Sequence, residues 1–135
     1  MKKPKSLPKL KKEALSLYSE LVKLRAFRDG KMFCYTCDRP LELHSSNTQL
    51  GHFLSRGCYP GLTFHSNNSR LQDYHCNIGL KGNTIEFRER LIAEIGLPAV
   101  ESLEAQRHNP VKLGRSDYVE MMRLFNEEIK TLKDE

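Results

Sequence analysis

Hydrophobic positions recur at helical spacing at both ends of the chain and lose that spacing in the middle. Apolar side chains between residues 10 and 28 recur every three or four positions, and Asp29 and Gly30 follow, which predicts an amphipathic helix with a defined end. Asn83 precedes a second periodic segment that stops at Gly96 and predicts another helix with Asn83 as its N-cap. The remaining helical segments are residues 97–106 and a last helix capped by Ser116, with an apolar stripe of Tyr118, Met121, Phe125, Ile129 and Leu132.

The middle of the chain favours short strands instead. Residues 48–54 and 61–66 are strand candidates, and the sequence SRGCYP between them supplies turn residues, so a β-hairpin is predicted. Residues 67–82 then follow as a loop that runs into a short helix. The fold class expected is α+β, with a small core of two strands and a helix flanked by N- and C-terminal helices.

The middle segment also holds all four cysteines. Cys34 and Cys37 have the C-x2-C spacing of a zinc knuckle, which normally needs a second pair to complete a tetrahedral site. Cys76 lies where that second pair is expected, but its companion position is Asp73. Zinc accepts carboxylate oxygen, so Cys34, Cys37, Asp73 and Cys76 are the predicted ligands of a structural zinc ion. His75 and Cys58 remain open as alternative fourth ligands.

Charge is concentrated at the N-terminus. The chain of 135 residues has a net charge of +5, and residues 1–31 alone carry ten basic against three acidic residues, a net of +7. A basic segment on a nearly neutral body suggests a polyanionic partner, most simply nucleic acid, although a solubilising terminus has the same pattern. No apolar run is long enough to span a bilayer and no signal peptide is evident, so we expect a reduced, intracellular protein without membrane contact.

Three polar residues of the middle segment have the chemistry of a phosphodiesterase. His52 is a candidate general base, and it needs a carbonyl or amide oxygen, such as that of Asn68, to fix its tautomer. Asn77 offers an amide oxygen to a hard cation such as Mg2+ or Mn2+. Arg56 and Lys81 are candidates for holding DNA phosphates, with plain surface charge as the equal alternative.

Several motifs together resemble a known family. The stretches CYTC, QLGHFLSRG, PGLTF, LQDYHCN and KGN, together with Asn68, are similar in order and spacing to the NinG/Rap family of lambdoid-phage recombination proteins. The resemblance covers most of residues 20–105. It implies an HNH-like nuclease fold (treble-clef or ββα-metal), a metal-dependent activity, and branched DNA such as Holliday junctions and D-loops as substrate.

The chain departs from that family's pattern at three positions. Asp73 stands where the family has a zinc-binding cysteine, Thr63 stands where it has arginine, and His65 is introduced beside it, as a candidate metal ligand or phosphate donor.

The resulting expectation is a metal-dependent DNA endonuclease of phage recombination, active in the host cytoplasm. A non-catalytic zinc-containing protein that binds junction DNA and assists a recombinase is the alternative, and a junction-cutting enzyme is expected to act as a homodimer. The chain divides into a basic tail (1–9), an N-terminal helix (10–30), a zinc-knuckle HNH-like core (31–96) and a C-terminal helical extension (97–135).

Overall fold

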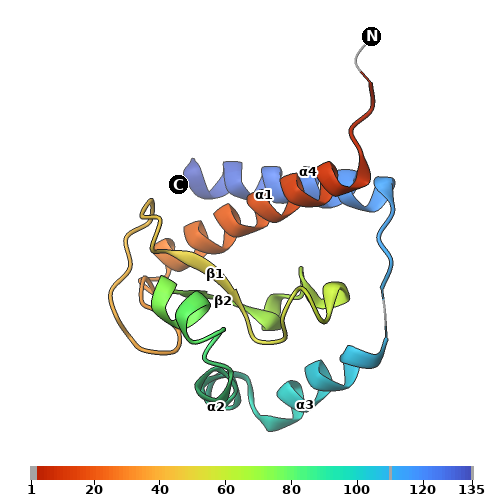
Figure 1. Ribbon diagram of the computed structural model, residues 1–135. Helices are drawn as coiled ribbons and strands as arrows, with labels where there is room; N and C mark the ends of the chain where they lie inside the picture. The colour runs from red at the N-terminus through yellow and green to blue at the C-terminus, as the bar shows by residue number, and fades with distance from the viewer. Residues whose placement is uncertain (1–2, 110, 135) are drawn as a thin grey trace.

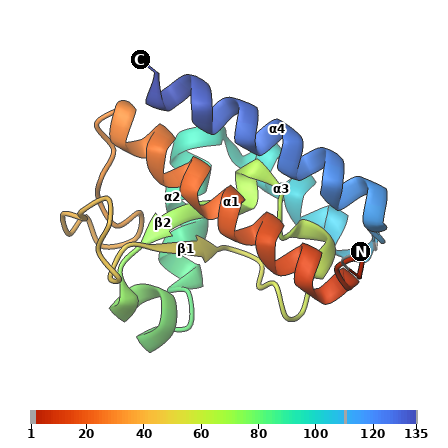
Figure 2. The ribbon, with the colours of Figure 1, turned by 90° about the horizontal axis from the view of Figure 1, so that it is seen from above.

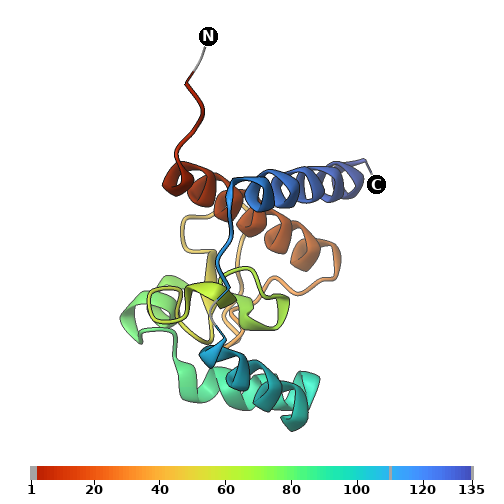
Figure 3. The same ribbon diagram turned by 90° about the vertical axis from the view of Figure 1, so that its right-hand side faces the viewer.

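The computed structural model describes residues 3–109 and 111–134. Two long helices lie together on one side of the molecule, two shorter helices lie on the other, and a small sheet lies between the two layers (Figures 1 and 3). The fold is therefore of the α+β class, as predicted. The main elements are α1 (Leu7–Arg28), β1 (Gln49–His52), β2 (Ser69–Gln72), α2 (Thr84–Ile95), α3 (Leu97–Ala105) and α4 (Arg115–Lys133).

Helix α1 begins earlier than the hydrophobic pattern predicts. The side chain of Ser6 accepts a hydrogen bond from the backbone N–H of Lys9, and Pro8 lies in the first turn, where its missing N–H costs nothing. The predicted basic tail of residues 1–9 is therefore too long, because helix α1 already starts at Leu7. Residues 1–2 of that tail lie outside the described part of the chain.

Helices α1 and α4 run side by side in the same direction (Figure 2). Leu10 and Ala14 of α1 are buried against Tyr118 near the start of α4, and the ring of Tyr18 lies 5.4 Å from that of Phe125 farther along. The apolar stripe predicted on the last helix thus packs within the chain, and its first buried residue is Tyr118. Burial of this stripe against α1 accounts for the position of α4.

The sheet consists of β1 and β2 in antiparallel register, with Gln49 opposite Gln72 and His52 opposite Ser69. The first predicted strand is confirmed over β1, but the second is wrong. Pro60–Leu62 instead forms a 3-10 turn (η1), which starts at Pro60 with its fixed φ and continues with a hydrogen bond from Thr63 N–H to Pro60 O. The chain pairs with β1 only after a second 3-10 turn, η2 (Ser66–Asn68).

A second core lies on the opposite side of the sheet from α4. Phe53, directly after β1, packs its ring 5.7 Å from Phe87 of α2, and Tyr35 packs 5.3 Å from the same ring. The buried members of this core are Phe53, Leu54, Leu62, Phe87, Leu91, Val100 and Leu103. None of the helices in the described ranges combines the length and apolar character needed to cross a membrane.

Gly51 of β1 has a packing reason to be glycine. A Cβ atom at this position would lie 2.0 Å from Oε1 of Gln72, on the paired strand. Gln72 is fully buried, and its Nε2 donates to Thr36 Oγ1 at 3.0 Å and to Gly82 O at 2.9 Å. The amide of Gln72 therefore occupies the space over Gly51 and links the knuckle, the sheet and the chain before α2.

We expect Gly51→Ala to lower the free energy of unfolding by about 1–3 kcal/mol, because the new methyl group displaces the buried amide of Gln72. The matched control is Gly57→Ala, since a Cβ atom at Gly57 meets no atom within 4 Å. Urea unfolding of both variants measures the difference. Equal stability of Gly51→Ala and the wild-type protein would contradict this packing.

Candidate functional site

Two short segments converge to form a candidate metal centre. Cys34 and Cys37 lie in a turn closed by a bridge between Phe33 and Pro40, and the backbone N–H of Tyr35 donates to Leu71 O of β2 at 2.9 Å. Beyond β2, Asp73 and Cys76 lie at the start of η3 (His75–Gly79), a single π-helical turn. The bond between Tyr35 and Leu71 places the first pair of ligands beside the second.

The four predicted zinc ligands have their donor atoms within 4.8 Å of one another. With Zn–S bonds of about 2.3 Å, sulfur atoms in a tetrahedral site lie about 3.8 Å apart, so a small contraction closes the cluster around an ion. Cys34, Asp73 and Cys76 are buried and Cys37 is half-buried. Three thiols and one carboxylate in a closed tetrahedral set are the donors of a structural zinc site, so this cluster can hold a metal such as zinc.

Hydrogen bonds already orient the carboxylate of Asp73. Its Oδ1 accepts from the backbone N–H of Cys76 at 2.7 Å, and its Oδ2 accepts from the thiol of Cys37 at 2.9 Å. Burial opposes ionisation of Asp73, but these bonds outweigh it and hold the pKa of the carboxyl below its usual value. Burial and the bond to Asp73 raise the pKa of the Cys37 thiol. A metal ion would replace the shared proton between the two side chains.

The alternative fourth ligands do not reach this cluster. His75 is exposed on η3, and Cys58 is exposed in the loop that precedes η1. Asn83 supports the site instead: its Nδ2 lies 3.8 Å from Cys76 Sγ, close enough to donate a weak hydrogen bond to sulfur. Asn83 does hold the N-cap position of α2, as predicted, but its side chain makes no capping bond there.

His52 lies at the end of β1 and is held in one tautomer. Its Nε2 is 2.9 Å from the carbonyl oxygen of Thr63. Because a carbonyl can only accept, Nε2 carries the proton and Nδ1 is the unprotonated nitrogen of the neutral ring. Burial and, to a smaller extent, the nearby charge of Arg56 lower the pKa of His52, and together they outweigh the opposing effect of the bond to Thr63 O. His52 is therefore neutral at pH 7, the state that a general base requires.

Asn68 does not make the contact predicted for it. Its Oδ1 accepts from Leu54 N–H at 2.7 Å, and its Nδ2 donates to Leu54 O at 2.9 Å and to Leu62 O at 3.1 Å. Asn68 is fully buried, and these bonds use its amide to close the loop between the strands. The oxygen that orients His52 belongs to Thr63, the residue after Leu62, so Asn68 acts on His52 only through the backbone.

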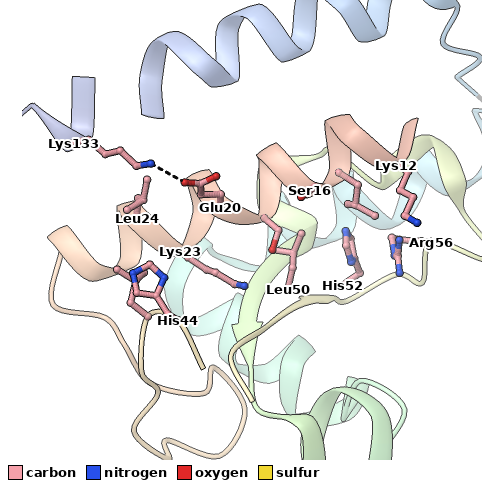
Figure 4. Close-up of a pocket in the computed structure, with 13 residues that line it drawn as sticks. Lys12, Ser16, Glu20, Lys23, Leu24, His44, Leu50, His52, Arg56 and Lys133 are labelled. Atoms are coloured by element: carbon pink, nitrogen blue, oxygen red, sulfur yellow. Dashed lines mark ion pairs between the residues drawn. The ribbon is translucent and has the colours of Figure 1, made fainter. Parts of the chain in front are cut away.

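A groove with a volume of about 750 Å3 lies between α1 and β1 and contains His52 (Figure 4). Its lining includes the predicted DNA-binding residue Arg56, together with Lys12 and Lys23 of α1. It also includes His44, which lies in the segment before β1. Lys12 and Lys23, with Ser16 and Ser19 between them, form a polar stripe on α1. This stripe is visible in the sequence but resembles an ordinary solvated helix face.

Asn77 and Lys81 lie away from this groove. Nδ2 of Asn77 donates to Gln49 Oε1 at 2.9 Å. Successive side chains of a strand point to opposite faces, so Gln49 and His52 of β1 face opposite sides of the sheet. The structure therefore does not bring Asn77 to the face of the sheet that carries His52, although the sequence made both candidates for the same phosphodiesterase chemistry. Lys81 is exposed in the turn after η3 and is not among the groove residues.

His65 has a local structural contact. Its Nδ1 accepts from the backbone N–H of Asn67 at 3.2 Å and so caps the short turn η2. Burial lowers the pKa of this half-buried ring. It is not part of the one cluster of metal-ligating side chains found among the described residues, so the expectation of His65 as a second metal ligand is not supported by its neighbours.

Comparison with known proteins places the chain in a phage family. A family model described as the bacteriophage lambda NinG protein matches residues 1–135. The chain belongs to the NinG family. No solved structure matches it.

Individual NinG proteins are similar over part of their length. "Protein ninG" of Escherichia phage lambda is 33% identical over 82 residues, which cover 61% of this chain and 38% of the lambda protein. "Protein ninG" of Salmonella phage P22 is 28% identical over 107 residues, or 79% of this chain and 51% of the P22 protein. The chain thus spans about half the length, or less, of these NinG relatives.

For this NinG-family chain we expect Asp73→Asn to lower zinc affinity. Loss of a residue that only hydrogen-bonds to a metal ligand lowers affinity by roughly 10–100-fold, and loss of the ligand itself should lower it further. Asparagine keeps the oxygen that accepts from Cys76 N–H, so the loss reports the missing carboxylate. Asp73→Cys should bind zinc more tightly, and the control His75→Ala should bind it normally. Competition with a chromogenic chelator measures all three. Loss of zinc from His75→Ala, with Asp73→Asn unaffected, would identify His75 as the ligand.

Proposed function

We propose that the protein is a metal-dependent DNA endonuclease that acts on branched recombination intermediates. The observation that carries the proposal is the setting of His52: its ring lines a basic groove, and its Nε2 lies 2.9 Å from Thr63 O. That arrangement leaves Nδ1 free to accept a proton from a water molecule that attacks a phosphodiester. A histidine with a purely structural role needs no such groove beside it.

The groove supplies charge for the phosphate backbone. Arg56 and Lys12 lie near His52, and Lys23 lies farther along the groove (Figure 4). Cations in these positions attract the phosphates of DNA and offset the charge that develops at the scissile phosphate. Arg56 also helps to keep His52 neutral, so one residue serves both binding and the protonation state of the base.

A divalent cation has a limited set of protein ligands here. Asn77 offers one amide oxygen, and the carboxylate of Glu20 in the groove already pairs with Lys133 at 3.1 Å. A Mg2+ or Mn2+ ion would therefore take most of its ligands from water and DNA, and it would stabilise negative charge at the scissile phosphate. Asn77 lies across β1 from His52, so an ion that it holds would not be the one at the phosphate that His52-activated water attacks.

The branched substrate is supported by the resemblance of the sequence motifs to phage recombination proteins. Membership of the NinG family agrees with that resemblance. The NinG relatives are longer than this chain. A homodimer and contact with a recombinase are therefore further parts of the proposal. A homodimer would place two copies of the groove on the two opposed strands of a junction.

The proposal is tested with zinc-loaded protein on labelled junction, flap and duplex DNA. We expect cleavage of branched DNA when Mg2+ or Mn2+ is added and no cleavage when it is omitted. The ion is omitted and no chelator is added, because a chelator would also remove the zinc. His52→Ala should reduce the cleavage rate by about 100–10,000-fold while junction affinity stays within a few-fold. The matched control is His108→Ala, which changes an exposed histidine outside the groove.

Two results would overturn this assignment. Normal cleavage by His52→Ala would remove His52 from the reaction. Tight junction binding by the wild-type protein, with no cleavage in either metal, would favour a non-catalytic accessory protein that binds junctions.

The pH dependence of cleavage follows from the lowered pKa of His52. Protonation of Nδ1 abolishes the base, so the rate should fall as pH decreases through a midpoint below about 6.5, the ordinary value for histidine. Arg56→Gln should move that midpoint upward, because it removes a charge that disfavours the imidazolium ion. Single-turnover rates from pH 5 to 8 at constant ionic strength measure both, and a wild-type midpoint above 6.5 would contradict the assignment.

A further inference from the structure

We propose that the groove between α1 and β1 binds a single strand of DNA, laid along α1 with one end at His52. The inference rests on the proposed function in taking DNA as the ligand, and it adds the form of DNA that the groove accepts. It derives from three properties of the groove: a polar helix face on one side, an apolar floor, and a size that excludes a duplex.

The helix side of the groove is a regular polar stripe. Lys12, Ser16, Ser19 and Lys23 recur at intervals of four, three and four residues, so they share one face of α1. At a rise of 1.5 Å per residue, the eleven steps from Lys12 to Lys23 span about 16 Å along the helix. Two ammonium groups with two hydroxyls between them offer successive donors to the phosphates of an extended strand.

Apolar and aromatic side chains line the rest of the groove. Leu50 of β1 points into it beside His52, and His44 lies at the opposite end, next to Lys23 (Figure 4). Bases of an unpaired strand expose flat apolar faces that pack on such side chains, and histidine is one of the rings on which they stack. Paired bases in a duplex hide those faces. The apolar part of the lining consists of Leu15, Leu24, Leu43 and Leu50.

The dimensions favour one strand. A volume of about 750 Å3 lies in the range of pockets that enclose a small-molecule ligand, and so it suits roughly two nucleotides. A duplex, whose major groove alone is about 12 Å wide, cannot enter. A duplex can contact the groove only from outside, through exposed lining residues such as Lys12 and Arg56.

The charges of the groove are complementary to such a strand. Glu20 is the one carboxylate in its described lining, and it is paired with Lys133. Lys12, Lys23 and Arg56 then give the groove an excess of positive charge. Because Arg56 and Lys12 lie beside His52, a strand in the groove brings a phosphate to the proposed base (Figure 4). A branch point supplies such a strand where pairing is interrupted.

Equilibrium binding without Mg2+ or Mn2+ tests the proposal apart from cleavage. Fluorescence anisotropy compares a 12-nucleotide oligo-dT, a duplex of equal length and a matched oligo-U with zinc-loaded full-length protein. We expect the oligo-dT to bind at least about tenfold more tightly than the duplex, through base contacts that the duplex lacks.

Two variants assign the binding to the groove. Lys12→Gln/Lys23→Gln should weaken oligo-dT binding about tenfold or more and reduce the slope of log affinity against log salt by about 1.4, or 0.7 for each phosphate contact. Ser16→Glu places a negative charge at the middle of the stripe and should weaken binding similarly. The matched controls are Lys9→Gln/Lys130→Gln and Ser46→Glu, which change exposed residues outside the groove.

The outcomes separate this inference from the nuclease proposal. Equal affinity for oligo-dT and duplex, tighter binding of oligo-U, or groove variants that bind like their controls would each overturn it. Single-strand binding that depends on the groove supports it even in a protein that never cuts. If the groove variants leave the cleavage of branched DNA unchanged, the nuclease proposal stands and the proposal of single-strand binding in the groove is refuted.

Discussion

The convergence of Cys34, Cys37, Asp73 and Cys76 is the constraint on which the rest of the structure depends. The sheet has two strands of four residues, too few to be stable alone. The ligand cluster joins the segment after α1 to the end of β2, and the buried amide of Gln72 extends that link to the chain before α2. A metal ion in this cluster would fix β2, which pairs with β1 and so positions His52. Substitution of aspartate for the fourth cysteine keeps the link, since the carboxylate is already oriented by two hydrogen bonds.

The position of His52 depends on backbone contacts at the end of the sheet opposite the metal cluster. Thr63 O accepts from its ring, and Asn68 holds the adjacent residue Leu62 and also Leu54. The bonds of Asn68 thus hold the irregular loop between the strands, and the path of this loop directs the carbonyl of Thr63 toward His52. Helix α1 then completes the groove. One helix therefore serves two purposes: its apolar face packs on α4, and its polar face lines the groove.

Side-chain pattern and spacing predicted much of this arrangement. The helices, the first strand and the metal cluster with Asp73 as a member follow from hydrophobic periodicity and ligand chemistry. The second strand was misplaced because residues 61–66 have an apolar pattern, whereas Pro60 starts a turn there and the pairing partner is Ser69–Gln72. The partner of His52 could not be predicted, since every residue has a carbonyl and only the fold selects that of Thr63. The groove could not be predicted for a related reason. The sequence shows Lys12 and Lys23 on a polar helix face, but it does not show that β1 lies beside that face.

The central claim is that a metal ion bound by three sulfurs and one carboxylate oxygen organises the molecule. X-ray absorption at the zinc edge of the purified zinc-loaded protein tests it directly. We expect three sulfur neighbours at about 2.3 Å and one oxygen at about 2.0–2.2 Å, with a fourth sulfur replacing the oxygen in Asp73→Cys. Four sulfur neighbours in the wild-type protein, or an imidazole signal that disappears in His75→Ala, would contradict the account.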